Sequence, residues 1–113
     1  MATPASPSVE QLFELLADPT RRGVVEALVA GPRRAGELAA ELGTSPPTMS
    51  RHLKALLDAG VVTDERLASD ARARVFHLRP DSMAAVRAWL DQLQAQWDEQ
   101  LGAFKRHVEG GPR

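Results

Sequence analysis

Residues 34–57 decide the fold, and they read RAGELAAELGTSPPTMSRHLKALL. The small Ala39 lies where two helices have to cross closely, and Gly43 permits the positive φ angle of a tight turn between them. Ser45 suits the N-cap of the second helix, and Pro46 suits its first position because no N–H donor is needed there. We therefore predict helices over residues 35–42 and 46–58, joined as a helix-turn-helix.

The second of these helices is predicted to have one apolar and one polar face. Met49, Leu53, Leu56 and Leu57 recur at the spacing of a buried stripe. The side chains directed away from that stripe are Pro47, Thr48, Ser50, Arg51 and Lys54. Short polar groups and a planar guanidinium near a helix N-terminus suit the DNA major groove, where arginine can contact O6 and N7 of guanine. The polar face is therefore a candidate for reading DNA.

Three further helices surround this motif. A capping-box pattern at Ser8 and Gln11 begins a first helix, and Asp18, followed by proline, begins a second. A last helix begins after the N-cap Asp81 and runs to about Val108. A short segment with a different pattern separates the last helix from the others.

That segment has the pattern of a β-hairpin. Residues 61–63 are β-branched and residues 73–78 alternate in polarity, which predicts two strands with a tip at residues 67–72. The expected order is α-α-α-α-β-β-α, a mainly α chain with a small β-hairpin (α+β). The 113-residue length and 43% apolar content fit one domain, expected over residues 8–109 with disordered tails at 1–7 and 110–113.

The hairpin and the helix before it form a weakly basic centre. Arg66, Arg72 and Arg74 of the hairpin can contact phosphates beside a groove. Residues 45–79 hold six Lys or Arg against four acidic side chains, in a chain whose net charge is −1. A polyanionic partner is consistent with this distribution, although ordinary surface charge is the simpler explanation of it taken alone.

The last helix carries an apolar seam. Its members, three or four residues apart, are Met83, Val86, Leu90, Leu93, Trp97, Leu101, Phe104 and Val108. A helix of about 27 residues is about 40 Å long, whereas a domain of this size is about 25–30 Å across. A core helix with a frayed end is one interpretation; a second copy of the chain that covers the seam, with the first helix contributing, is favoured. The predicted dimer interface comprises Val9, Leu12, Phe13, Leu16, Met83, Val86, Leu90, Leu93, Trp97, Leu101 and Phe104.

Several other side chains have two interpretations. His52 suits packing or a phosphate contact, and His77 suits a surface position more than a DNA contact. The arginine pairs at residues 21–22 and 33–34 resemble phosphate clamps near a duplex, and for residues 21–22 surface salt bridges with Glu26 and its neighbours are an equal interpretation. Trp89 and Trp97 could line an effector pocket, but aromatic residues at helical spacing more often pack.

Catalysis and metal binding are not expected. Ser50 and His52 are two residues apart and point about 200° away from each other on a helix, so they cannot share a proton. The chain has no cysteine, which excludes thiolate metal sites, and we expect no cofactor. No apolar run approaches the roughly 18–20 residues of a membrane span, and the first residues do not resemble a secretory signal. A cytoplasmic protein is expected.

Four sequence blocks in this order resemble the ArsR family of bacterial winged-helix transcriptional regulators. The blocks are LADPTRR (16–22), GELA (36–39), SRHLKAL (50–56) and AGVV (59–62). The resemblance covers about residues 9–108 and implies a winged helix-turn-helix, dimeric through its first and last helices. It implies that helix 46–58 reads DNA and that residues 61–79 form the wing. The implied DNA-binding positions are Ser45, Pro46, Pro47, Thr48, Ser50, Arg51, His52 and Lys54, with Arg72 and Arg74 on the wing.

The chain departs from the family pattern in two places. Pro46 and Pro47 stand where relatives often carry polar side chains, so specificity would depend more on Thr48, Ser50 and Arg51 and on DNA shape. The cysteines of metal-responsive members are absent from the third helix, and the last helix has only His107, so a small molecule is the effector to test. We expect a homodimeric repressor of its local operon; the alternative is a helical adaptor or antitoxin-like protein that binds another protein through the seam.

Overall fold

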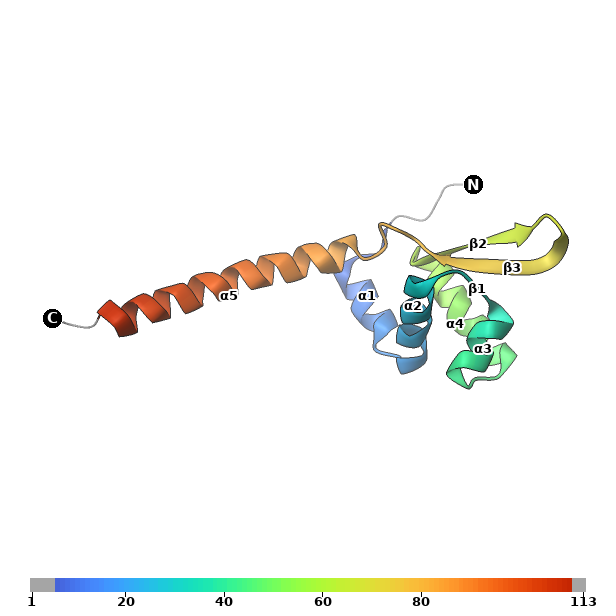
Figure 1. The fold of residues 1–113 in the computed structure, drawn as a ribbon, viewed down its shortest axis with the longest axis horizontal. Helices are drawn as coiled ribbons and strands as arrows, with labels where there is room; N and C mark the ends of the chain where they lie inside the picture. The colour runs from blue at the N-terminus through green and yellow to red at the C-terminus, as the bar shows by residue number, and fades with distance from the viewer. Residues whose placement is uncertain (1–5, 111–113) are drawn as a thin grey trace.

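A computed structural model describes residues 6–110, leaving out the side chains of residues 70–72 (Figure 1). The elements are α1 (Val9–Leu16), α2 (Pro19–Ala30), β1 (Arg33–Arg34), α3 (Ala35–Leu42), α4 (Pro46–Asp58), β2 (Val62–Leu67), β3 (Asp70–Leu78) and α5 (Ala84–Gly110). The predicted order is confirmed, with one short strand added. The first four helices pack together, the β2–β3 hairpin extends from one side of them, and α5 projects away on the other (Figure 1).

The turn between α3 and α4 has the predicted chemistry. Gly43 has a φ of 65°, in the left-handed region that favours glycine, and its N–H donates to the carbonyl of Ala40. Ser45 is the N-cap of α4, where its hydroxyl accepts a hydrogen bond from the Thr48 N–H at 3.3 Å. These local contacts fix the angle at which α4 leaves the turn.

Arg21 and Arg22 have a role that neither interpretation of them anticipated. Arg21 Nε donates to the Leu15 carbonyl at 2.7 Å, and Arg22 donates to the Leu16 carbonyl at 2.6 Å. These carbonyls are at the C-terminus of α1, where the last turn has no N–H partners of its own. The two guanidinium groups therefore cap α1 from α2, and the proposed salt bridge with Glu26 is not the contact they make.

The sheet has three antiparallel strands in the order β1-β3-β2. In its register Val62 lies opposite Leu78 and Thr63 opposite His77, with an irregularity after Arg66. β2 and β3 are longer than predicted, so the hairpin turn is at residues 68–69 rather than across residues 67–72. The extra strand, β1, joins the other edge of β3 and has only two residues, too few for any periodicity to reveal.

One core joins the helices and the sheet. Its buried side chains are Leu12, Val24, Leu28, Leu38, Ala39, Met49, Leu53, Leu56, Val61, Val62 and Phe76. Met83 and Val86 pack against this core from the start of α5. Leu12, which was predicted for the dimer interface, is instead fully buried in this core, so it has no surface to offer a second chain. Met83 and Val86 likewise contribute mainly to their own chain.

The first residues that the structure describes precede the predicted boundary at residue 8 and pack against the domain. Pro7 is fully buried, and the Ser6 hydroxyl donates to Asp81 Oδ2 at 3.0 Å. The other oxygen of Asp81 pairs with Arg79 at 3.2 Å, just before α5. At the other end Gly110 is the last residue of α5, whereas a tail was expected from there. The remainder of the two predicted tails, residues 1–5 and 111–113, lies outside the described residues.

Candidate nucleic-acid interface

One face of α4 is open to solvent along its whole length. Met49, Leu53 and Leu56 are buried in the core. The exposed side chains on the opposite face are Pro46, Pro47, Ser50, Arg51, Lys54 and Asp58. The structure therefore brings together five of the predicted DNA-binding side chains on one rod-like surface, which has the dimensions that a major groove accepts.

Three polar side chains at the start of α4 are linked by hydrogen bonds. The Ser45 hydroxyl donates to Thr48 Oγ1 at 2.9 Å, and Arg51 Nη2 donates to the same Oγ1 at 3.3 Å. Thr48 is therefore half-buried between an N-cap and a guanidinium. The Arg51 side chain is held along the first turns of the helix, with its remaining N–H donors available to a ligand.

The other cations of this surface pair with carboxylates of the same chain. Lys54 Nζ lies 3.1 Å from Asp58 Oδ2. On the wing, Arg74 Nε donates to Asp64 Oδ2 at 2.7 Å, and the guanidinium lies 5.2 Å from the ring centre of Phe76. Because these pairs are solvent-exposed, each is weak enough for a phosphate to compete with the carboxylate.

Two further wing positions were predicted to contact DNA. Arg66 is exposed on β2 and lies directly opposite Arg74 in the sheet register, so two guanidinium groups share this part of the hairpin. The predicted contact Arg72 lies among the side chains outside the described residues. His77, for which a surface position was preferred, pairs with Glu65 at 2.8 Å.

His52 lies off the exposed face of α4. It is half-buried on the flank next to the N-terminus of α2. Asp18, the N-cap of α2, has a pKa below its ordinary value of 3.8, chiefly because the Arg21 N–H donates to its carboxylate, with smaller contributions from the Thr20 N–H and the positive charge of His52. The structure thus places His52 half-buried on the flank of α4, off the face that carries the exposed predicted DNA-binding side chains.

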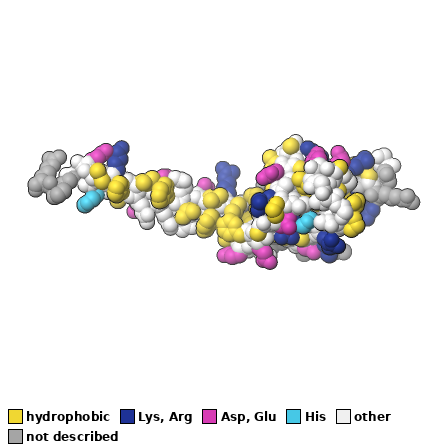
Figure 2. Space-filling view, turned by 90° about the horizontal axis from the view of Figure 1, so that it is seen from below, with side chains coloured by type: hydrophobic (Ala, Val, Ile, Leu, Met, Phe, Trp, Pro, Cys, Tyr) yellow, Lys and Arg dark blue, Asp and Glu magenta, His cyan; other side chains and the backbone are white. Residues whose placement is uncertain are grey.

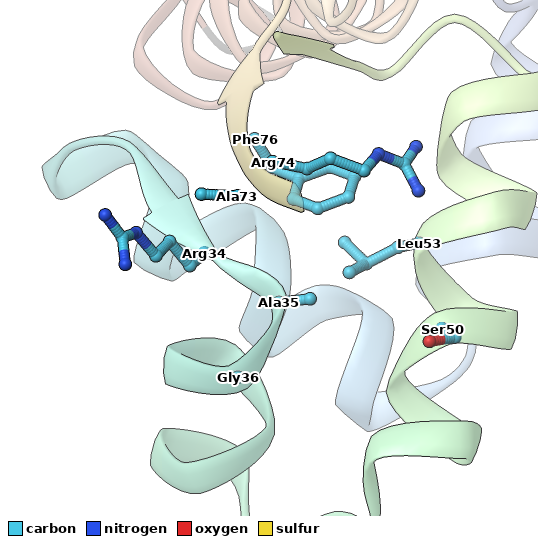
Figure 3. Close-up of a pocket in the computed structure, with 8 residues that line it drawn as sticks. All are labelled: Arg34, Ala35, Gly36, Ser50, Leu53, Ala73, Arg74 and Phe76. Carbon is cyan, nitrogen blue, oxygen red and sulfur yellow. The ribbon is translucent and has the colours of Figure 1, made fainter. Parts of the chain in front are cut away.

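A groove that sequence reasoning missed separates α4 from the wing. Its lining comes from β1, the start of α3, α4 and β3, namely Arg34, Ala35, Gly36, Ser50, Leu53, Ala73, Arg74 and Phe76. Figure 3 shows an apolar floor at Phe76 and Leu53, with the Arg74 side chain crossing the Phe76 ring and the Arg34 guanidinium pointing away from the groove. The sequence singled out the pair at residues 33–34 as a phosphate clamp, but only the pairing of β1 with β3 brings Arg34 to the edge of this groove.

The apolar seam is the second feature available for binding. Hydrophobic side chains form a line along α5 (Figure 2). The most exposed of its large members are Leu90, Leu93, Trp97, Leu101, Phe104 and Val108, each 45–66% accessible. Phe13 of α1, 48% exposed, makes an edge-to-face contact with Trp89 at 5.3 Å between ring centres, so the apolar surface continues from α5 onto α1. Val9 and Leu16, also predicted for the interface, are half-buried on α1.

Other kinds of site have little support within residues 6–110. No group of three or more His, Asp or Glu side chains in this range could hold a metal ion. No helix of the described range is both long and apolar enough to cross a membrane. The α4 face, the wing and the seam are therefore the candidate binding surfaces of the described residues.

Known proteins share this arrangement. A family profile described as a helix-turn-helix domain matches residues 16–65. The HTH-type transcriptional regulator Rv2034 of Mycobacterium tuberculosis is 38% identical over 109 residues, spanning 96% of this chain and 94% of that protein. The transcriptional repressor SdpR of Bacillus subtilis is 36% identical over 58 residues, 51% of this chain and 64% of SdpR. A solved ArsR family transcriptional regulator matches with a TM-score of 0.69 and 32% identity, covering 80% of this chain and 96% of its own.

Proposed function

Since the chain belongs to the ArsR family of winged helix-turn-helix transcriptional regulators, we propose that it is a homodimeric repressor that binds operator DNA through α4 and the wing. The similar protein SdpR, which matches about half of this chain, is a transcriptional repressor. Each protomer inserts α4 into a major groove and sets the β2–β3 hairpin against the adjacent backbone.

The observation that carries this proposal is the hydrogen-bonded chain from Ser45 through Thr48 to Arg51. These hydrogen bonds restrain the planar Arg51 guanidinium at the exposed start of α4. Because the side chain is already restrained, Arg51 loses less conformational entropy when it binds guanine. Pro46 and Pro47 flank it with apolar surface and no side-chain donors. Base readout therefore depends chiefly on Arg51 and Ser50, and Thr48 acts by holding Arg51.

The wing supplies contacts to phosphate rather than to bases. Arg66 and Arg74 lie opposite each other on neighbouring strands, within one hairpin that extends past the end of α4. Binding replaces the intramolecular partner Asp64 of Arg74 by a phosphate. Because Arg74 exchanges one anionic partner for another, the net gain in binding free energy at this position is small. DNA affinity is therefore expected to depend on several such contacts together.

Two copies are needed because one protomer presents one recognition helix. A two-fold dimer matches a palindromic site and doubles the number of base contacts. The surface available for the dimer is the apolar seam of α5 with Phe13 of α1. A protein-binding adaptor could use the same seam, and it would then bind a different partner and no duplex.

The test is binding of the full chain to a duplex from its own upstream region, followed by fluorescence anisotropy at several salt concentrations. The proposed function predicts a log affinity that falls linearly with log salt, and weaker binding to a scrambled duplex of the same length. Sedimentation of the free protein in the same buffer should give twice the chain mass.

The opposite results are equally clear. A chain that ignores both duplexes in dilute salt, and that sediments as a monomer or captures an unrelated protein, would favour the adaptor function. Equal affinity for the two duplexes would leave DNA binding in place and remove sequence-specific repression.

A further inference from the structure

We propose that Asp64 of β2 is a specificity-determining residue, which keeps the wing cation Arg74 neutralised until operator DNA displaces it. This inference rests on the proposed DNA-binding function and assigns a further residue to it. Asp64 is exposed on a hairpin that faces DNA in that proposal, although a carboxylate repels phosphate. Its contacts within the wing explain what a carboxylate does there.

Asp64 is paired closely with Arg74 across the hairpin. Arg74 Nε donates to Asp64 Oδ2 at 2.7 Å, and Arg74 Nη2 pairs with the same oxygen. The guanidinium also lies 5.2 Å from the ring centre of the buried Phe76, which is directly opposite Asp64 in the sheet register. A carboxylate and an aromatic ring therefore hold Arg74 together, and the cation that the wing offers to DNA is the one that Asp64 neutralises.

Asp64 lies on the face of the hairpin where arginines gather. Alternate residues of a strand share a face, so Asp64 and Arg66 lie on one face of β2, and the register puts Arg74 on the same face of β3. Arg66 is directly opposite Arg74, and like charges in that position destabilise a sheet. One carboxylate beside two guanidinium groups lowers both their repulsion and their attraction for a polyanion.

A hollow between α4 and the wing shows the same balance of charge. Its volume is about 370 Å³, and its lining includes Lys54, Asp58 and Arg74. In Figure 3 the Arg74 guanidinium points from β3 toward α4. Lys54 Nζ lies 3.1 Å from Asp58 Oδ2, and Arg74 pairs with Asp64, so each cation of this lining has its own carboxylate. A DNA backbone that passes between α4 and the wing meets two ion pairs rather than two free cations.

Such pairs act weakly on loosely bound DNA. Non-specific complexes are held almost entirely by attraction between protein cations and backbone phosphates. Because an ion pair has no net charge, it attracts a distant phosphate much less than a lone cation does. While Asp64 holds Arg74, we therefore expect Arg74 to contribute little to non-specific binding.

Operator DNA meets the wing differently. Once base contacts hold α4 in the major groove, the neighbouring phosphate is fixed beside the wing and competes with Asp64 at a high effective concentration. The pair is partly solvent-exposed, with side-chain exposures of 43% for Arg74 and 29% for Asp64, and exposed ion pairs are weak enough to exchange. Arg74 thus joins the complex only after α4 has recognised its bases, which increases the preference for the operator.

The test is Asp64→Asn, which keeps the size of the side chain and removes its charge. Glu109→Gln is the matched control, because Glu109 also pairs with a cation, Lys105 at 3.9 Å, but near the end of α5. Anisotropy titrations of the full chain with the operator duplex and with a scrambled duplex, at several salt concentrations, give the affinities. Circular dichroism and sedimentation verify that each variant keeps the fold and assembly of the parent, and Asp64→Ala serves as a second variant.

Asp64→Asn should bind the scrambled duplex about eightfold more tightly in about 0.1 M salt for each wing in contact, because each freed cation adds one phosphate contact. The slope of log affinity against log salt should become steeper by about 0.9 for each such contact. Operator binding should gain only about twofold for each wing, since an exposed ion pair of low stability no longer has to be broken. The preference for the operator should therefore fall about fourfold or more, whereas Glu109→Gln should leave it unchanged.

The Arg74→Gln background shows whether Asp64 acts through Arg74. In that background Asp64→Asn should no longer change the preference for the operator, because the cation that Asp64 neutralises is absent. A change in preference of the same size in both backgrounds would mean that Asp64 acts on DNA by itself, and it would overturn the proposal.

Equal gains in affinity for the two duplexes would overturn the role of Asp64 in specificity. Unchanged binding of both duplexes by Asp64→Asn would overturn its control of Arg74. In both cases a parent chain that prefers the operator would still support the proposed repressor. A parent chain that binds neither duplex would overturn the proposed function and this inference together, so the two failures are distinguishable.

Discussion

The head (residues 6–83) and the arm (α5) are built on opposite principles. The head closes a core within one chain, where Leu12, Val24 and Leu56 have no exposed surface. The arm is as apolar along one face, yet Trp97 and Phe104 are 55% and 66% exposed. Because burial of apolar surface is the main stabilising contribution in both, the head is stabilised by its own chain, whereas the arm leaves most of its apolar face to the second copy of the proposed dimer.

This difference separates two tasks. A recognition helix has to present polar groups at a constant angle, which requires the closed core beneath Met49 and Leu53. A dimerisation helix has to leave its apolar face uncovered until a partner arrives. Substitutions confined to the head or to the arm should therefore have separate effects on folding, association and DNA binding.

The largest effect is expected in the core of the head. Leu56→Ala should lower the free energy of unfolding by about 2–5 kcal/mol, because it leaves a cavity among fully buried neighbours. Denaturant unfolding at a fixed protein concentration measures it. Val29→Ala, at a position 70% exposed on α2, is the matched control and should change the free energy by less than about 0.5 kcal/mol. Equal effects of the two substitutions would contradict a closed core.

The next effect is expected in the arm. Trp97→Ala should weaken the proposed dimer by about 2 kcal/mol or more, about thirtyfold in its dissociation constant, because it removes a large exposed aromatic side chain from the seam. Sedimentation equilibrium provides the constant. Glu99→Ala lies two residues away and off the seam, and it should leave the dimer unchanged. An unaltered dimer in the Trp97 variant would move the interface elsewhere.

A smaller effect is expected at the exposed face of α4. Arg51→Ala should cost about 1–3 kcal/mol of operator binding and reduce the preference over scrambled DNA, because the bidentate contact to a base is lost. Anisotropy titrations with both duplexes measure the two changes. Arg106→Ala removes the same charge near the end of α5 and serves as the control. Parent-like binding to both duplexes would show that Arg51 does not read bases.

The smallest effect concerns the N-cap of α2. The pKa of Asp18 is below 3.8 in the folded chain, so its charge contributes stability that is present above pH 3.8 and lost as the pH falls through the folded-state pKa. Asp18→Asn keeps an N-cap side chain and removes this titration. In a pH series of melting temperatures, the parent should be more stable near neutral pH, and the difference should shrink below pH 3.8. If the difference in melting temperature between the parent and the variant persists in acid, it arises from packing and not from the charge of Asp18.

Local chemistry explains why much of the architecture was predictable. The N-caps Ser8, Asp18 and Ser45 and the left-handed Gly43 act within four residues of the chain, so a short stretch of sequence reveals them. The alternation of buried and exposed positions along α4 depends only on helical periodicity. Four of the five side chains predicted for its polar face, Pro47, Ser50, Arg51 and Lys54, are exposed, whereas Thr48 is half-buried.

Several details depend on contacts between distant segments and were missed. Arg21 and Arg22 cap α1 because the turn at residues 17–18 folds α2 back beside it. Arg34 reaches the groove beside α4 only through the pairing of β1 with β3. Leu12, Phe13 and Leu16 all belong to the apolar residues of α1. Only the packing of the other elements against α1 decides that Leu12 is enclosed and Phe13 is not.

The helix-turn-helix, its caps and the apolar seam of the last helix can be read from the amino-acid order, since periodicity and capping are properties of neighbouring residues. Which apolar side chains the head encloses, where His52 lies, and how far α5 projects beyond its own core depend on the folded chain. Burial depends on which surfaces meet, and surfaces meet according to the whole chain's packing rather than to any one segment.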